Sequence, residues 1–248
     1  MNKRHLILPI SLVCGMGAIA LFSPSNTKAV EAEGTEPVTK TITLTADSFE
    51  WGQKIGENLS YVNGYGEIVY SMINNAVEFN SHGNNQNYKT AEYNIKKLIY
   101  DVQKIMLPVA TDNSNSILVE FDSSIPDFLV GATEEIKRII INLVCESLKN
   151  THDGLITIGV SGRKIESDGM NLIISIEDNG VSMQRDIVRK LVQFNTKSKK
   201  WDKNIFDDGY FKIRIAKYLI ERMHGKLHID SEVDKGTKYT IVLPQEII

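Results

Sequence analysis

Apolar residues recur along the chain with two different spacings, and the change between these spacings predicts alternating helices and strands. Segments with apolar residues three and four positions apart are expected to be helices, namely 51–79, 90–106, 134–150, 183–194 and 210–223. Short, mostly alternating segments are expected to be strands, namely 116–121, 155–161, 171–177, 226–231 and 237–243. Because most of these strands come in adjacent pairs, they predict a mixed sheet with helices on one face. The expected fold is α+β, a two-layer α/β sandwich with a mixed sheet that follows a helical segment.

The first residues of the chain, 1–29, have the composition of a targeting segment. Lys3 and Arg4 provide a basic start, and an uncharged, mostly apolar stretch follows from Leu6 to Phe22. A basic start, an apolar middle and a small residue at the cut are typical of a signal peptide, and a membrane anchor is the alternative. Because basic residues precede the stretch and acidic residues follow it, the positive-inside rule places the rest of the chain outside the cytoplasm. If the segment is not a signal, the protein is expected in the cytoplasm.

Residues 30–48 and 49–107 are expected to connect this segment to the sandwich at 115–244. The first of these is polar and threonine-rich, which indicates a linker. The second contains apolar residues with the spacing of a helix that packs against another helix. These residues are Val62, Tyr65, Val69, Met72, Ala76 and Phe79. We therefore expect residues 49–107 to support dimerisation.

Charge and composition exclude several classes of function. The formal net charge of the 248 residues is -3, so no overall positive field attracts nucleic acid. The two cysteines, Cys14 and Cys145, lie far apart and allow neither a disulfide framework nor a CxxC metal pair. The five histidines do not show the HExxH spacing of a metal site. Contact with a membrane is expected only through residues 1–29.

Three segments follow one another in a fixed order in the C-terminal half of the chain. They are Asn142–Thr151 on a predicted helix, Glu177–Met183 directly after a predicted strand, and Ile215–Pro244 near the end. In this order and spacing they resemble the ATP-binding domain of sensor histidine kinases, which belongs to a wider family that includes gyrase and the Hsp90 chaperones. The resemblance extends upstream over the predicted dimerisation helix and covers about residues 53–244.

The resemblance implies a nucleotide-binding site for ATP. Asp178 occupies the place of the aspartate that accepts the adenine amino group in this family, and Gly180 would let the backbone come close to the base. A turn between a strand and a helix would show the same Asp-Asn-Gly sequence, so the flanking segments support the assignment. The other nucleotide-binding residues that the resemblance implies are Asn142, Glu146, Lys149, Gly209 and Thr237.

The phosphate-binding end departs from the family pattern. Glu146 stands where the family has an asparagine that holds Mg²⁺, and although a glutamate can ligate Mg²⁺, it adds negative charge beside a polyphosphate. Ser182 replaces a glycine of the family. Of the glycine-rich run only Gly209 remains, and Tyr210–Lys212 fill space that phosphates would occupy. We therefore expect weakened binding of ATP and Mg²⁺, with Glu146 as the candidate metal ligand.

Independent catalysis is not expected, and no catalytic residue is assigned. Sensor kinases carry a phosphoacceptor histidine on their first dimerisation helix, whereas only His5 precedes Trp51 in this chain. The resemblance implies an impaired or inactive histidine-kinase-like protein of two-component signalling. Its expected partners are a second copy or a histidine kinase, and a response regulator. Two alternatives stay open, namely an active cytoplasmic kinase that acts in trans and an exported, non-enzymatic interaction module.

Overall fold

The computed structural model describes strands near the N-terminus, part of one helix and most of the C-terminal domain. The described residues are 9–15, 18–20, 40–43, 59, 62, 64–71, 73–74, 88–123, 125–165, 169–196 and 209–247. The chain divides into two compact units, Met1–Leu59 and Ser60–Ile248.

Three short strands form a small sheet in the first unit. β1 (Pro9–Gly15) pairs antiparallel with both β2 (Ala18–Ala20) and β3 (Lys40–Thr43). β1 and β2 fall within the apolar stretch that the sequence predicts to be a targeting segment. Across the residues that the structure describes, no helix combines the length and apolarity needed to cross a membrane. The targeting role of this segment stays a prediction.

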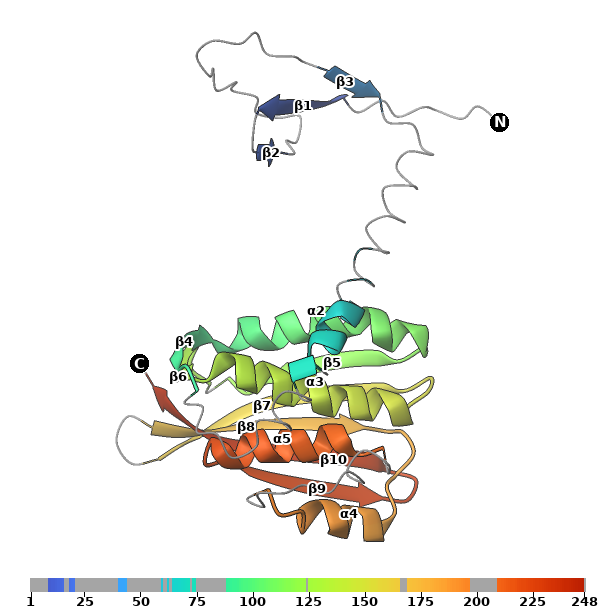
Figure 1. Cartoon of the computed structure of the whole chain (residues 1–248), viewed down its shortest axis with the longest axis vertical. Helices are drawn as coiled ribbons and strands as arrows, with labels where there is room; N and C mark the ends of the chain where they lie inside the picture. The colour runs from blue at the N-terminus through green and yellow to red at the C-terminus, as the bar shows by residue number, and fades with distance from the viewer. Residues whose placement is uncertain are drawn as a thin grey trace. The chain divides into compact units, whose positions relative to one another are not determined.

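A mixed sheet of seven strands runs through the second unit (Figure 1). The strand order is β4-β6-β10-β8-β7-β5, and β9 also pairs with β10. β5 and β7 run parallel, whereas the other pairings described for this sheet are antiparallel. The strands are β4 (Ala91–Asn94), β5 (Ser116–Phe121), β6 (Phe128–Gly131), β7 (Leu155–Lys164), β8 (Gly169–Asp178), β9 (Lys226–Glu232) and β10 (Gly236–Ile247).

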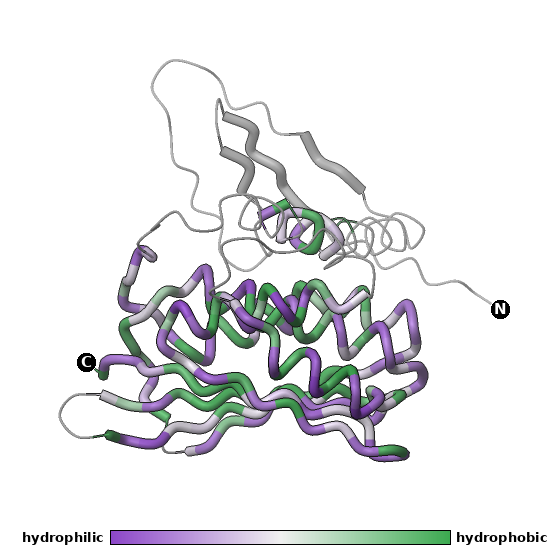
Figure 2. Tube along the Cα trace, turned by 60° about the horizontal axis from the view of Figure 1, so that its bottom comes forward, coloured by the Kyte–Doolittle hydropathy of each residue, from purple (hydrophilic) through white to green (hydrophobic). Residues whose placement is uncertain are grey.

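Helices cover one face of this sheet, so the domain has two layers (Figure 2). The helices are α2 (Ile95–Asp112), α3 (Thr133–Asn150), α4 (Arg185–Val192) and α5 (Phe211–Arg222). α3 contacts both α2 and α5 and packs on β7 and β8. The predicted fold class is confirmed, namely a two-layer sandwich with a mixed sheet that follows a helical segment along the chain.

The helix α3 supplies the centre of the hydrophobic core. Its apolar side chains are fully buried, namely Ile136, Ile139, Ile140 and Leu143. Burying an aliphatic side chain of this size contributes roughly 1.5–3 kcal/mol relative to leaving it exposed. The same helix also buries three polar residues, Asn142, Glu146 and Ser147. Because buried polar groups are costly without partners, these three residues mark the part of the core that needs explanation.

The start of α2 differs from the prediction that a helix begins at Thr90. Ala91–Asn94 instead forms β4, which pairs antiparallel with β6. The side chain of Asn94 accepts a hydrogen bond of 2.8 Å from the amide of Lys97 and so caps the helix. Neither β4 nor β6 was predicted, because four residues are too few to show a strand period.

The end of α2 also differs, because the helix continues past Pro108, where the sequence predicts that it stops. A proline removes one backbone donor and costs free energy inside a helix. Met106 and Ala110, on either side of it, are fully buried. The hydroxyl of Thr111 donates to the carbonyl oxygen of Leu107 at 2.8 Å. Core packing on both sides of the proline therefore outweighs its local cost.

The helical residues 64–71 and 73–74 pack one face against α2 and α3. Gly64 is buried, and a Cβ atom there would lie 2.6 Å from the carbonyl oxygen of Ile105. Glu67 forms an ion pair of 3.1 Å with Lys137 on α3. The close approach of this segment to α2 explains why a glycine, which is a poor helix former, occupies position 64.

The opposite side of this helical segment exposes apolar residues. They are Val62, Tyr65, Val69, Tyr70 and Ile73. Three of these, Val62, Tyr65 and Val69, belong to the predicted dimerisation seam. The other three members of that seam, Met72, Ala76 and Phe79, have side chains outside the described residues. The seam stays a prediction. Val62 and Val69 face solvent in the single chain, whereas the hydroxyl of Tyr65 donates a hydrogen bond to Asp112 at the end of α2.

Candidate functional site

Asp178 is the last residue of β8, and backbone amides hold one of its carboxylate oxygens. The residue is only 2% exposed. Its Oδ1 accepts hydrogen bonds from the amide of Gly180 at 3.1 Å and from the amide of Thr237 at 3.2 Å. The second bond follows from the sheet register, which places Thr237 of β10 opposite Asp178. Three of the predicted site residues therefore meet at this end of the sheet.

Three buried polar atoms at or near Asp178 have no hydrogen-bond partner among the described residues. Within the described part of the chain, Asp178 Oδ2, Ser147 Oγ and Tyr239 Oη have no hydrogen-bond partner. A buried polar group left in this way costs roughly 1–3 kcal/mol. The Ser147 hydroxyl lies near enough to Asp178 to lower the pKa of its carboxyl, yet the two groups do not reach hydrogen-bond geometry. One carboxylate oxygen and two hydroxyls are thus left unsatisfied in the described part of the folded chain.

The pKa values of these groups reflect their burial. Burial raises the pKa of Asp178 above its ordinary value of 3.8, although Ser147 and the two backbone amides offset part of the effect. Burial also raises the pKa of Tyr239 well above its ordinary value, and the charges of Glu146 and Asp178 add to the increase. Tyr239 therefore lies within electrostatic reach of both carboxylates.

Glycines let the backbone close tightly around Asp178. A Cβ atom at Gly180 would overlap the carbonyl oxygen of Asn150, which also accepts a hydrogen bond of 2.8 Å from the amide of Val181. Gly236 has a φ of 87°, and a Cβ atom there would overlap the carbonyl oxygen of Asp178. The sequence predicts that Gly180 lets the backbone approach a base. In the structure, a glycine is required at position 180 because the backbone at the end of α3 leaves no room for a Cβ atom.

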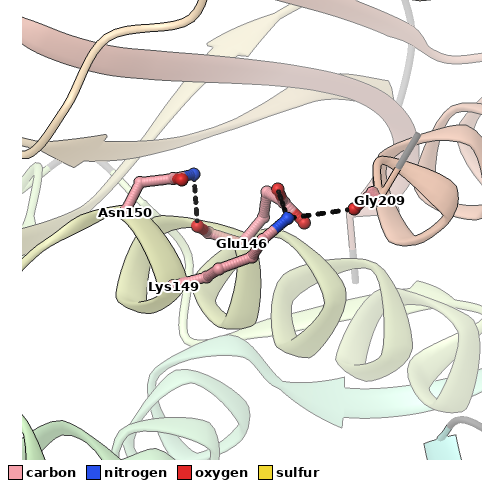
Figure 3. A network of polar contacts seen from close by, with 4 residues as sticks. All are labelled: Glu146, Lys149, Asn150 and Gly209. Carbon is pink, nitrogen blue, oxygen red and sulfur yellow. Dashed lines mark hydrogen bonds and ion pairs between the residues drawn. The ribbon is translucent and has the colours of Figure 1, made fainter.

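A second polar group lies further along α3, where Lys149 joins Glu146 to Gly209 (Figure 3). Lys149 Nζ donates to Glu146 Oε1 at 3.2 Å and to the carbonyl oxygen of Gly209 at 3.1 Å. The side chain of Glu146 is 1% exposed and that of Lys149 is 50% exposed. Asn150 Nδ2 donates to the backbone oxygen of Glu146 at 2.9 Å. A buried carboxylate is thus paired with a lysine that has already used two of its three donors.

Gly209 and Tyr210, the two residues directly before α5, both contact Lys149. Gly209 adopts a φ of 76° and presents its carbonyl oxygen to Lys149. The ammonium also lies 5.2 Å from the centroid of the Tyr210 ring. The predicted residues Glu146, Lys149 and Gly209 are therefore brought together, and Asn142 is buried one turn earlier on α3.

Glu146 is the predicted Mg²⁺ ligand, and its Oε1 is bonded to Lys149. Among the residues with described positions, no group of three or more His, Cys, Asp or Glu side chains is arranged to hold a metal ion. A magnesium ion at a nucleotide site also takes oxygens from phosphates and water. Binding of Mg²⁺ at Glu146 stays a prediction.

Sequence reasoning did not assign Ser147 and Tyr239 to the site. Ser147 follows Glu146 directly, and its position on the buried side of a helix suggested a core role. Tyr239, Ile241 and Leu243 are buried at every second position of β10, which is the pattern of a strand that faces the core. Thr237 lies two residues before Tyr239, and side chains two residues apart in a strand point to the same face of the sheet. This spacing is the signal that could have placed Tyr239 beside the predicted site residue Thr237.

Comparisons with known proteins agree with this architecture. Residues 131–247 match the family of histidine kinase-, DNA gyrase B-, and HSP90-like ATPases. Over 195 residues the chain is 23% identical to the autoinducer 2 sensor kinase/phosphatase LuxQ of Vibrio cholerae, and the matched stretch covers 77% of this chain and 22% of that protein. Over 190 residues it is 26% identical to sporulation kinase B of Bacillus subtilis, and the matched stretch covers 74% of this chain and 41% of that protein. The chain thus spans less than half the length of these curated relatives.

A solved structure shows the same fold. The full-length protein ShkA, solved in complex with AMPPNP, is similar with a TM-score of 0.58 and 18% identity, over 83% of this chain and 40% of that one. At this level of identity the similarity concerns the fold alone. Residues 131–247 of this chain form a domain of the histidine kinase-, DNA gyrase B-, and HSP90-like ATPase family, homologous to that of sensor histidine kinases.

Proposed function

We propose that this chain is a histidine-kinase-like component of two-component signalling that binds the adenine part of a nucleotide and has a degraded phosphate-binding end. The observation that carries the proposal is the carboxylate of Asp178. It is buried, Oδ1 is held by two amides, and Oδ2 has no partner among the described residues. A carboxylate in this state accepts a hydrogen bond from an amino group such as that of adenine.

The phosphate-binding end does not fit a complex of ATP with Mg²⁺. Lys149 is already bonded to Glu146 and Gly209. A phosphate in this place would meet the carboxylate of Glu146 and the carbonyl oxygen of Gly209. Two like charges 4 Å apart repel by about 4 kcal/mol at the effective dielectric constant of such sites. We therefore propose that ATP and Mg²⁺ bind weakly here.

Phosphoryl transfer to a histidine of this chain is not part of the proposed activity. The sequence contains no histidine between His5 and His82. We propose that the chain acts together with a histidine kinase that carries the acceptor, and with its response regulator. In a phosphorylation assay with radiolabelled ATP, we expect no label on this chain alone. Label on this chain would favour an active kinase instead.

Retention of the adenine site can be tested with one pair of variants. In Asp178→Asn, the amide oxygen can still accept from Gly180 and Thr237, but an NH₂ group replaces the free acceptor. We expect saturation-transfer NMR signals of adenine on the full-length protein to disappear in this variant. Glu177→Gln is the matched control, because Glu177 is exposed and pairs with Lys238 at 2.7 Å. Loss of the adenine signals in both variants, or in neither, would contradict the assignment of Asp178.

A homodimer through the exposed apolar side of the helical segment is also proposed. Val62 and Val69 are 67% and 53% exposed, and they lie seven residues apart on one side of a helix. Val62→Glu with Val69→Glu should change the mass measured by light scattering from dimer to monomer. Val233→Glu, at an exposed valine in a distant turn, is the control. A wild-type protein that is monomeric at all concentrations would refute the proposal.

Export or anchoring by residues 1–29 remains a proposal that rests on the basic start and the apolar stretch. A topology reporter fused after Ile248 should be active outside the cytoplasm. Activity only in the cytoplasm would exclude export.

A further inference from the structure

We infer that this site selects a purine nucleoside without a polyphosphate chain and binds it independently of Mg²⁺. The inference rests on the proposed function, because it takes Asp178 as the adenine-binding residue. It adds the class of ligand and an order of affinities that is the reverse of the one expected for an ATPase.

The first observation is the chemistry of the polar atoms near Asp178. Adenine presents an amino donor next to a ring-nitrogen acceptor. Asp178 Oδ2 can accept from the amino group, and a hydroxyl of Ser147 or Tyr239 can donate to the ring nitrogen. All three atoms are buried and lack partners among the residues with described positions. An uncharged base therefore satisfies groups that are left unsatisfied in the described part of the folded chain.

The second observation is that the protein supplies its own anion at the other end. Glu146 is 1% exposed, and Lys149 is its hydrogen-bond partner among the described residues. If Lys149 turned to a phosphate, the carboxylate of Glu146 would stay buried without its cation. Because Lys149 is half exposed and Glu146 is buried, separating this pair costs free energy, although less than separating a fully buried pair. A phosphate that recruits Lys149 therefore binds at the expense of the ion pair with Glu146.

The third observation concerns the backbone at the start of α5. Phosphates are commonly bound by backbone amides at the start of a helix, which carry positive partial charge. Here the group that faces Lys149 is the carbonyl oxygen of Gly209, which carries negative partial charge. The ring of Tyr210 lies over the same ammonium, 5.2 Å from its centroid. Each added phosphate thus meets negative groups at this end and weakens binding.

Isothermal titration of the full-length protein with adenosine, AMP, ADP and ATP, each with and without Mg²⁺, tests the inference. We expect adenosine to bind at least about tenfold more tightly than ATP, since a repulsion of about 1.4 kcal/mol already gives that factor. Mg²⁺ should not reverse the order. If ATP with Mg²⁺ binds more tightly than adenosine, the inference is wrong, while the proposed adenine site stands. If none of the four ligands binds, the adenine site itself is refuted.

The near-isosteric variant Glu146→Gln tests the cause of the selectivity. It removes the buried anion and releases Lys149, so the affinity of ATP relative to adenosine should rise about tenfold. Glu177→Gln removes an exposed carboxylate next to Asp178 and should leave this ratio unchanged. A ratio that stays the same in Glu146→Gln, with the thermal unfolding curve showing a folded protein, would overturn the role assigned to Glu146.

Discussion

The two ends of the candidate site differ in how their buried polar groups are satisfied. Near Asp178, two backbone amides hold one carboxylate oxygen, and three other polar atoms have no partner among the described residues. Near Glu146, the carboxylate, the ammonium of Lys149 and the carbonyl oxygen of Gly209 bond to one another. Unsatisfied groups on a rigid frame favour a ligand, whereas mutually bonded groups oppose one. Local hydrogen bonding thus distinguishes the two ends of the site that we propose to bind a nucleotide.

The largest effect is expected from Gly236→Ala, which breaks the frame around Asp178. Gly236 has a φ of 87°, and the added methyl group would overlap the carbonyl oxygen of Asp178. Backbone strain and overpacking together should reduce the free energy of unfolding by about 3–5 kcal/mol. Urea denaturation measures this loss. Gly66→Ala is the control, because its site is an exposed helical position with no atom within 4 Å, and it should stabilise by about 0.5–1 kcal/mol. Equal changes in the two variants would contradict the close packing at Gly236.

The next effect is expected from Lys149→Met, which breaks the bonded end. Removing one partner of a fully buried ion pair costs about 3–5 kcal/mol. Because Lys149 is 50% exposed, water can reach the remaining carboxylate, and we expect a loss of about 1–3 kcal/mol in urea denaturation.

Two further variants sharpen this measurement. Adding Glu146→Gln to Lys149→Met should restore most of the lost stability, because no charge is then left buried. Lys97→Met on α2 removes a pair with Asp101 that is exposed on both sides, so its cost should be below about 0.5 kcal/mol. A loss that persists in the double variant would mean that Lys149 stabilises the fold by packing alone.

A smaller effect of opposite sign is expected from Tyr239→Phe. The hydroxyl of Tyr239 is buried without a hydrogen-bond partner in the described part of the protein. Its removal should therefore raise the free energy of unfolding by about 1 kcal/mol, measured by urea denaturation without ligand. A variant that is less stable than the wild type would show that this hydroxyl has a partner, and it would remove Tyr239 from the set of ligand-binding groups.

An effect confined to a window of acidic pH is expected in the pH dependence of stability. Burial raises the pKa of Asp178 in the folded state above its ordinary value of 3.8, so the folded state binds this proton more tightly than the unfolded chain does. The contribution of Asp178 to stability therefore increases as the pH falls through the raised folded pKa and becomes constant below 3.8. Relative to Asp178→Asn, the wild type should gain at most about 1.4 kcal/mol per pH unit within this window. A relative loss of stability on acidification would show that the amides of Gly180 and Thr237 outweigh burial.

Much of the fold follows from sequence periodicity. The predicted strand at 116–121 coincides with β5, and the predicted helix at 134–150 differs from α3 by one residue. These elements are long enough to display their period and have clear ends. The short strands β4 and β6 and the continuation of α2 past Pro108 were missed, because they depend on pairing and packing with distant residues.

The candidate site was predictable as a set of residues but not as a set of contacts. The motifs named Asp178, Glu146 and Lys149, and the sheet register explains why Thr237 joins Asp178. The bond between Lys149 and Gly209 joins residues 60 positions apart and is decided by tertiary structure. Unsatisfied atoms such as Tyr239 Oη likewise cannot be read from a sequence, since they are defined by the absence of neighbours within the described fold.

The difference between the two ends can be measured most directly by amide NMR of the full-length protein during titration with adenosine and with ATP and Mg²⁺. The amides of Gly180 and Thr237, which bond to Asp178, should shift with adenosine. The amide of Gly209 should not shift with ATP and Mg²⁺ at concentrations that saturate the adenosine response. A shift of Gly209 that tracks ATP binding, with no response at Gly180 or Thr237 to adenosine, would contradict a retained adenine end and a closed phosphate end.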